Sequence, residues 1–221
     1  MEIEAPRDFN HGMAAIREDS RLELLFAEIL SAIEAISEEE IIAFFEKQSR
    51  SAKSISEAIN KLLDRNLVSR GWDRQSPIYK DESLNDKTWT LDFSKGSERV
   101  EGKQAGIPIE VVFNHGEAVA WNLIKLSLAS ESNVRKKFDY SPSVGVYICA
   151  NAELKDKGGF DGAIGEYERV LQYLNPMDIK IPKPLVIIGL KAPLSFYIER
   201  YPNDFPITAK RGRSTGKLVR V

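Results

Sequence analysis

The sequence has few of the residues that mark several protein classes. It contains one cysteine and two histidines among 221 residues. A disulfide framework within the chain is therefore excluded, and His11, His115 and Cys149 share no spacing typical of zinc ligands. The longest apolar run, Pro184 to Leu190, is far too short to cross a bilayer. The N-terminal segment lacks the basic and apolar parts of a signal peptide. We therefore expect a soluble, cytoplasmic protein.

An excess of charge of either sign is also missing. The chain has 31 Lys and Arg against 33 Asp and Glu, which gives a formal net charge of −2. A nucleic-acid site would therefore require local segregation of charge. Residues 21–46 are strongly acidic, whereas residues 205–221 carry bases and no acid, and Arg135-Lys136-Lys137 forms another basic patch. The basic end could be a solvated tail, or it could become ordered on phosphate groups.

Apolar residues at helical spacing predict an amphipathic helix over residues 21–36. Serine–glutamate capping boxes predict the starts of two further helices, at Ser37 with Glu40 and at Ser54 with Glu57. After these helices the apolar residues no longer recur at helical spacing. Residues 94–106 form a polar stretch typical of a turn or hairpin tip. The other predicted elements are strands at 87–93, 107–113, 144–150 and 185–190, and helices at 117–130 and 163–174.

This order of elements predicts an α/β fold with a central mixed β-sheet flanked by helices and an N-terminal helical region. No internal repeat and no linker rich in Gly, Ser or Pro divides the chain. We therefore expect a single domain over residues 1–221. Its predicted parts are a helical part at 1–75, an α/β core at 87–190 and a basic C-terminal segment at 191–221.

Two carboxylates stand out in the predicted strands. Asp92 lies at the end of one strand, and Glu110 lies in the middle of the apolar strand that follows. Burying such a carboxylate costs several kcal/mol unless another group compensates its charge. A divalent cation is the usual compensation where carboxylates from neighbouring strands converge. A salt bridge, or an edge position that exposes Glu110 to water, is the alternative.

The order of short motifs narrows these alternatives. Asp92-Phe93 is followed by the strand Ile109–Phe113 and by a helix that contains Ala120-Trp121-Asn122-Leu123. The strand Pro184–Gly189 follows near the C-terminus. In this order the motifs resemble the type II restriction endonucleases of the BglII and BstYI group, within the nuclease superfamily written PD-(D/E)xK. The similarity extends over roughly residues 20–190.

The resemblance implies a restriction-endonuclease-like fold and Mg²⁺-dependent, sequence-specific double-strand cleavage of DNA that leaves 5′ phosphates. It implies that Asp92, Glu110 and the Val111 carbonyl hold the metal ion. It also implies a homodimer on a short palindromic site and a cognate DNA methyltransferase. The residues that we expect to contact DNA are Lys210, Arg211, Arg213, Lys217, Arg135, Lys136, His115 and Asn114.

Val112 departs from the superfamily pattern. A residue two positions beyond Glu110 shares its face of the sheet, and the superfamily places Lys, Glu or Gln there. Lys125 on the following helix is our first candidate for a replacement, ahead of Glu117 and Lys103. Alternatively, metal-bound water attacks with help from the scissile phosphate and needs no such residue, or the chain is catalytically inactive. Glu28 occupies a family position that supports the metal site, and it could equally be an ordinary helix residue.

A non-enzymatic DNA-binding regulator is the second hypothesis. Residues 39–72 resemble a helix, a turn, a helix and the start of a wing. In that arrangement Ser54, Ser56, Asn60 and Lys61 would line the recognition helix. This hypothesis leaves the carboxylates and the α/β half unexplained. Metal dependence separates the two, because a regulator binds duplex DNA without a divalent ion and never cuts it.

Overall fold

The computed structural model describes residues 1–48, 52–81, 87–113, 115–131, 137, 139–177, 182–201 and 215–221. In these residues a mixed seven-stranded sheet has the order β1-β7-β6-β4-β3-β2, and β5 pairs with β4. Pairing is parallel for β4–β5, β4–β6 and β6–β7 and antiparallel elsewhere. The strands are β1 (Arg7–Phe9), β2 (Asp73–Pro77), β3 (Thr90–Val100), β4 (Lys103–Val112), β5 (Tyr140–Ser143), β6 (Gly145–Ala150) and β7 (Leu185–Leu190).

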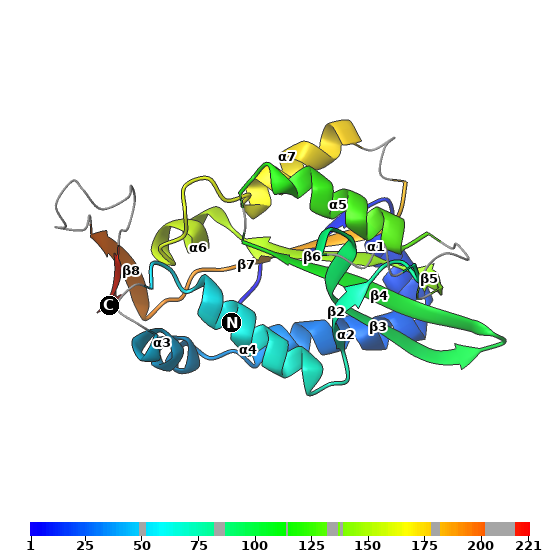
Figure 1. The fold of residues 1–221 in the computed structure, drawn as a ribbon, viewed down its shortest axis with the longest axis horizontal. Coiled ribbons are helices and arrows are strands. Elements are labelled where there is room, and N and C mark those ends of the chain that lie inside the picture. Colours follow the sequence, from blue (N-terminus) through cyan, green and yellow to red (C-terminus); the bar gives the residue numbers. More distant parts are fainter. Residues whose placement is uncertain are drawn as a thin grey trace.

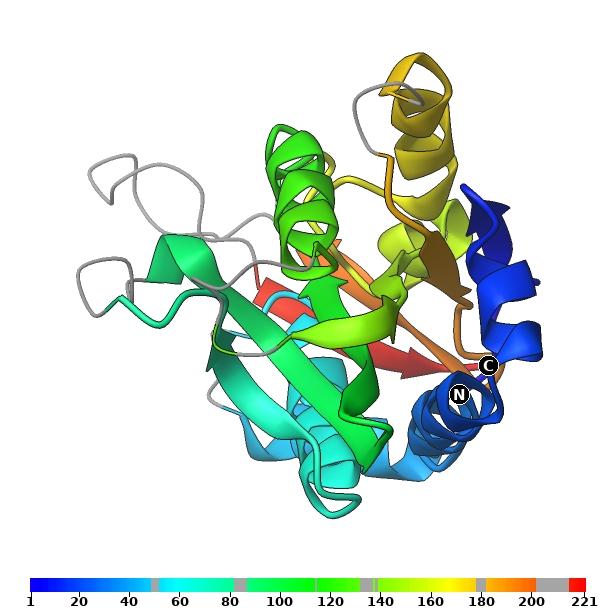
Figure 2. The ribbon, with the colours of Figure 1, turned by 90° about the vertical axis from the view of Figure 1, so that its right-hand side faces the viewer.

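Helices cover both faces of this sheet. Helices α5 and α7 lie on one side and α2 and α4 on the other (Figure 1), and the rotated view shows the same division (Figure 2). The helices are α1 (Gly12–Glu18), α2 (Ser20–Glu34), α3 (Glu38–Lys47), α4 (Ser56–Val68), α5 (Ala118–Ala129), α6 (Ala152–Lys157) and α7 (Tyr167–Met177). No described helix combines the length and the apolar character needed to cross a lipid bilayer.

Alternation along the central strands builds a core on each face. Ile107 and Ile109 of β4 pack in the larger core with the N-terminal helices. Val112 of the same strand and Tyr147 of β6 pack in the smaller core with α5 and α7. The face of β4 that carries Val112 and Glu110 is therefore the face toward α5.

Of the two predicted capping boxes, one is present in the structure and the other is not. The capping box of Ser37 with Glu40 is confirmed, since each side chain bonds the backbone N–H of the other residue. The box predicted at Ser54 is wrong, because Ile55 is the N-cap of α4 and makes no side-chain cap bond. The Ser54 hydroxyl instead accepts a hydrogen bond from the backbone N–H of Ser56, at 3.4 Å.

The stretch 94–106, expected as a polar turn or hairpin tip, is a hairpin whose residues are mostly strand. Strands β3 and β4 run through it and leave Glu101 and Gly102 as the turn. Both turn residues have a positive φ, 50° and 77°. A two-residue turn of this kind matches the twist of the strands that it joins, so the stretch is a hairpin with a shorter turn than the polar sequence suggests.

Several elements lie outside the predicted pattern. Strands β1 and β2 belong to the main sheet although they fall within the part expected to be helical. A second sheet pairs β8 (Phe196–Tyr201) with β9 (Thr215–Arg220). The expectation of a solvated tail is therefore wrong for Thr215–Arg220, which is held by backbone hydrogen bonds to β8. Helices α1 and α6 are further additions.

Candidate active site

Asp92 and Glu110 lie on neighbouring antiparallel strands. Phe93 of β3 pairs with Ile109 of β4, and Ser94 pairs with Pro108. One step further along the same register brings Asp92 opposite Glu110, on the face toward α5. Opposite residues of an antiparallel pair have Cβ atoms about 5 Å apart, so the two carboxylates converge.

Glu110 is buried beside a lysine from α5. Its residue is 3% exposed and Lys125 is 7% exposed. The Lys125 ammonium lies 2.8 Å from Glu110 Oε1, and it donates a hydrogen bond to the Thr90 carbonyl at 3.1 Å. The contact with Oε1 is an ion pair by distance but not a well-directed hydrogen bond, since Oε1 has no hydrogen-bond partner. Lys125 is thus the partner that balances part of the Glu110 charge.

Burial and the charge of Asp92 raise the pKa of the Glu110 carboxyl from 4.5 to about 8, although Lys125 acts in the opposite direction. Burial also raises the pKa of Asp92, against a hydrogen bond from the Val111 N–H. This bond to Asp92 Oδ2 is 2.8 Å long and fixes the orientation of the carboxylate. One ammonium is therefore too little positive charge for two desolvated carboxylates.

These residues fit a divalent cation. Glu110 Oε1 is a buried acceptor without a hydrogen-bond partner, and Asp92 offers a second carboxylate on the same face. Among the described residues no group of three or more His, Cys, Asp or Glu gathers at one point. A pair of carboxylates with few other protein ligands suits Mg²⁺, which keeps several of its waters and prefers oxygen ligands.

The carboxylates open into a cleft of about 510 Å³. Its walls come from α4, β2, β3, β4 and α5. Asn60, Lys61, Asp64, Arg74, Gln75, Thr90, Asp92, Phe93, Glu110, Val111, Val112, Phe113, Asn122 and Lys125 line it. Sequence reasoning missed Arg74 and Gln75, because the polar strand β2 gives no alternating signal. Gln75 has a φ of 50°, a left-handed conformation that is uncommon for residues other than glycine.

The structure separates the three candidates for the function missing at Val112. Val112 lines the cleft with an apolar side chain, and Lys125 reaches Glu110 from α5. Glu117 is exposed before the first turn of α5 and does not line the cleft. Lys103 begins β4, seven residues from Glu110, which corresponds to about 23 Å along a strand. Of the three, only Lys125 lies at the carboxylates.

Glu28 has a different position from the one expected for a residue that supports the metal. Its carboxylate lies 2.7 Å from the Lys95 ammonium and accepts a hydrogen bond from the Trp72 indole at 2.9 Å. Glu28 does not line the cleft. It joins α2 to β3 and to the start of β2 instead.

The residues expected to contact DNA are only partly described. His115 is exposed beyond the end of β4, forms a bridge with Ile164 and does not line the cleft. Lys217 lies on β9, at an exposed position. Lys210, Arg211, Arg213, Arg135, Lys136 and Asn114 lie outside the described residues.

Comparison with known proteins tests the expected family. The sequence model of the restriction endonuclease BglII/BglIII family matches residues 6–190. The chain belongs to this family. It is a sequence-specific type II restriction endonuclease, a site-specific deoxyribonuclease, and the family implies a divalent metal ion. The regulator hypothesis is replaced, since β2, where its wing would begin, pairs with β3 in the main sheet.

Solved structures support the fold. The crystal structure of restriction endonuclease BglII complexed with a DNA 16-mer matches with 16% identity and a TM-score of 0.60, over 100% of both chains. The structure of free BglII matches with 11% identity and a TM-score of 0.47, again over 100% of both chains. No curated protein sequence matches the chain. The predicted α/β fold with a central mixed sheet is thus confirmed by a structure of low sequence identity.

Proposed function

We propose that this endonuclease hydrolyses both strands of a short palindromic DNA site with Mg²⁺ as its ion, leaving 5′ phosphates and 3′ hydroxyls. The observation that carries the proposal is the cluster of buried Glu110 and Lys125 with half-buried Asp92 at the wall of an open cleft. The enzyme would act in the cytoplasm, with a cognate methyltransferase protecting the host DNA.

Asp92 and Glu110, with the Val111 carbonyl, would hold the ion. When bound, Mg²⁺ supplies positive charge that stabilises the phosphoryl transition state and lowers the pKa of water. The Val111 N–H holds the Asp92 carboxylate in place through its 2.8 Å bond. The two strands therefore fix the carboxylates before DNA enters the cleft, so that little reorganisation accompanies the reaction.

Lys125 would take the role of the superfamily residue that Val112 replaces. Its stem crosses the apolar surface between α5 and the sheet, and its ammonium ends 2.8 Å from Glu110. A cation at this point can orient the attacking water and stabilise negative charge on the phosphoryl group. Asn122, three residues earlier on α5, also lines the cleft, so one helix face supplies both polar side chains.

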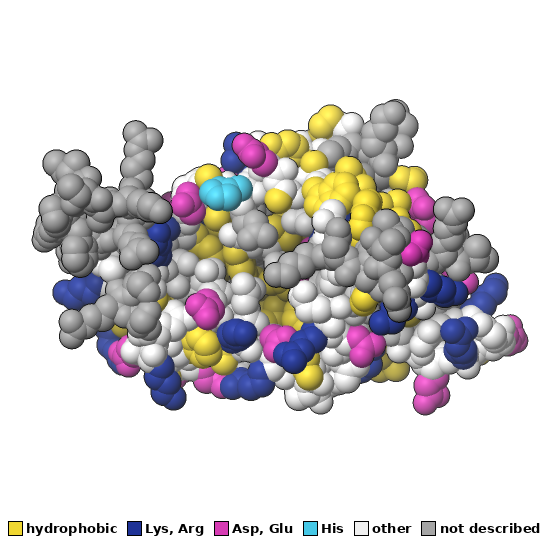
Figure 3. All heavy atoms as spheres, in the orientation of Figure 1, with side chains coloured by type: hydrophobic (Ala, Val, Ile, Leu, Met, Phe, Trp, Pro, Cys, Tyr) yellow, Lys and Arg dark blue, Asp and Glu magenta, His cyan; other side chains and the backbone are white. Residues whose placement is uncertain are grey.

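The other side of α5 supports a homodimer. Lys125 is the one charged residue in α5, and it is buried. Trp121 and Ile124 are 37% and 39% exposed. Trp89 packs edge-on against Trp121, with ring centroids 5.0 Å apart, and Figure 3 shows hydrophobic side chains gathered over this region. A helix that is apolar on all sides is normally buried, so this surface requires a partner.

A second copy of the chain is the partner that fits. In a two-fold contact a residue near the axis meets its own copy, and an uncharged surface avoids repulsion between like charges. Cleavage of both strands of a palindrome also requires two active sites related by two-fold symmetry. Because the same helix carries Lys125 on its inner side, the contact would lie directly behind the active site.

The test of the function is incubation of the protein with phage DNA and Mg²⁺, beside a reaction with chelator. We expect discrete fragments with Mg²⁺ and none with chelator, and end-labelling should find 5′ phosphates. DNA methylated by the cognate methyltransferase should resist cleavage. Duplex binding without cleavage at any Mg²⁺ concentration would contradict the proposal.

The test of the dimer is sedimentation of a Trp121→Glu/Ile124→Glu variant. Its charges would be forced together at a two-fold contact, so we expect a monomer where the wild type is a dimer. Leu24→Glu is the matched control, because Leu24 is an exposed apolar residue (69%) on α2. A doubly substituted protein that stays dimeric would exclude this surface as the contact.

A further inference from the structure

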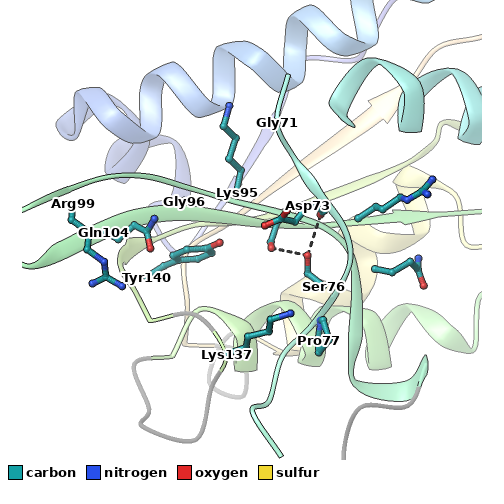
Figure 4. Close-up of a pocket in the computed structure, with 13 residues that line it drawn as sticks. Gly71, Asp73, Ser76, Pro77, Lys95, Gly96, Arg99, Gln104, Lys137 and Tyr140 are labelled. Atoms are coloured by element: carbon teal, nitrogen blue, oxygen red, sulfur yellow. Dashed lines mark hydrogen bonds between the residues drawn. The ribbon is translucent and has the colours of Figure 1, made fainter. Parts of the chain in front are cut away.

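A second cavity of about 480 Å³ adjoins the catalytic cleft. Arg74 and Gln75 of β2 line both spaces, so the two lie on either side of this pair of residues. Figure 4 shows the second cavity between β2 and the hairpin of β3 and β4, with Lys137 and Tyr140 along one side. None of the functions assigned above uses this cavity.

The floor of the cavity is a row of hydroxyl groups. The Ser94 hydroxyl donates to Ser76 Oγ at 2.8 Å, and Ser76 donates to the Asp73 carbonyl at 3.0 Å. The Tyr140 ring packs against Gly106 and Gly96, where a Cβ atom would approach ring atoms to 2.3 and 2.7 Å. Both positions must therefore lack a side chain for the floor to form. The floor is polar but carries no charge.

The rim of the cavity is positively charged. Arg74, Arg99 and Lys137 line it with exposed side chains, and Asp73 is the one acidic residue among those that line it. Arg74 lies 3.5 Å from Asp64 in an ion pair in which its side chain is 66% exposed, and such a pair is weak. Lys95 also contributes to the lining, but it points away toward α2 (Figure 4), where Glu28 neutralises it. In a chain with a net charge of −2, this rim is a local excess of cations.

We propose that this second cavity binds the sugar–phosphate backbone of the DNA strand that continues beyond the scissile phosphate. The proposal rests on the proposed function of the neighbouring cleft. Arg74 pairs with Phe93, one residue beyond Asp92 on β3, and Arg99 lies seven residues beyond Asp92. These separations correspond to roughly 3 and 23 Å along the strand. Along the duplex axis, successive phosphates of one DNA strand are spaced about 3.4 Å apart. The cations therefore meet phosphates roughly one to seven nucleotides from the cut, and they bind any sequence equally.

The experiment measures binding of a mixed-sequence duplex, without metal, at several salt concentrations. Arg99→Ala/Lys137→Ala removes two exposed cations of the rim. Arg17→Ala/Lys47→Ala is the matched control, since both residues are exposed and lie on α1 and α3, away from β2. In the rim variant the slope of log affinity on log salt should flatten by up to about 0.9 for each phosphate that is no longer neutralised. Equal slopes for the rim variant and the control would overturn the proposal.

Uncharged methylphosphonate linkages locate the bound phosphates. One such linkage is placed at each position from about one to seven nucleotides from the mapped cut. At one or more of these positions it should weaken binding by the wild type and leave binding by the rim variant unchanged. An equal loss of affinity in both proteins, or a loss that depends on base sequence, would also overturn the proposal. Asp92→Ala should keep the wild-type salt slope. A protein that never cuts DNA would contradict the proposed function, whereas the mixed-sequence measurement would still test the cavity.

Discussion

The catalytic cleft and the second cavity share Arg74 and Gln75 but differ in how they hold charge. In the cleft Glu110 and Lys125 are almost fully buried, so each charge depends on its immediate neighbours. Around the second cavity the cations are exposed, and water and salt screen them. The comparison teaches that single substitutions should have large effects in the cleft, whereas effects at the rim should be small and roughly additive.

The largest effect is expected at the carboxylates. Asp92→Ala or Glu110→Ala should lower the rate of cleavage by roughly a thousandfold or more, because each removes a proposed oxygen ligand of the metal ion that would stabilise the transition state. DNA binding should survive, since the loss of negative charge near a phosphate favours the complex. Cleavage assays beside binding assays check both parts. Either variant cutting DNA at the wild-type rate would remove that residue from the site.

Lys125 tests whether the lysine of α5 replaces the residue missing at Val112. Lys125→Ala should lower the rate by about a hundredfold or more while DNA affinity changes little. Lys125→Met is the control for packing, because it keeps a long apolar stem and should be equally slow. Adding Val112→Lys should restore part of the rate, since Val112 lines the cleft on the same face as Glu110. Normal cleavage by Lys125→Ala would exclude this role.

A substitution in the floor of the second cavity should have an intermediate effect. It should change the stability of the protein and not the rate of cleavage. Gly106→Ala would bring a Cβ atom to 2.3 Å from the Tyr140 ring, and we expect a loss of about 1 to 3 kcal/mol in the free energy of unfolding. Gly162→Ala is the control, because nothing lies within 4 Å of its added Cβ. Urea denaturation of both variants measures the difference. Equal stability of the two would mean that the ring moves aside freely.

The smallest effect is expected for the hydroxyl row. Ser76→Ala removes the acceptor of the buried Ser94 hydroxyl, which should cost about 1 kcal/mol. Ser97→Ala removes an exposed hydroxyl of the same strand and should change the free energy of unfolding by less than about 0.5 kcal/mol. Urea denaturation again provides the measurement. A larger loss for Ser97→Ala would contradict the buried character of the floor.

The grouping of Glu110 with Lys125 could be predicted because each residue leaves a local sign in the sequence. Glu110 interrupts an apolar strand, and a carboxylate there requires a compensating charge. Lys125 follows on the next helix, close enough along the chain to reach back to that strand. The central strands β4, β6 and β7 were equally predictable, because strands buried on both faces are continuous apolar runs.

The second cavity could not be predicted in this way. Arg74, Arg99 and Lys137 are far apart in the sequence. The pairing of β2 with β3 brings Arg74 and Arg99 together, and a hydrogen bond from the Lys137 N–H to the Ile78 carbonyl places Lys137 beside them. Strand β2 has the sequence DRQSP, in which neither alternation nor a β-branched residue indicates a strand. Its structure is imposed by the backbone hydrogen bonds of β3, an interaction that local patterns do not carry.

Strand β2 also has a consequence for solubility. It ends the seven-stranded sheet, as β1 does at the other edge, and an open edge strand can template pairing between molecules. Asp73, Arg74 and Pro77 oppose this pairing, through charge in the first two and through the missing N–H in the proline. Apolar substitutions at Asp73 or Arg74 should therefore increase aggregation during expression, even where the folded protein is as stable as before. Arg74, which borders both cavities, thus also helps to keep the sheet from growing.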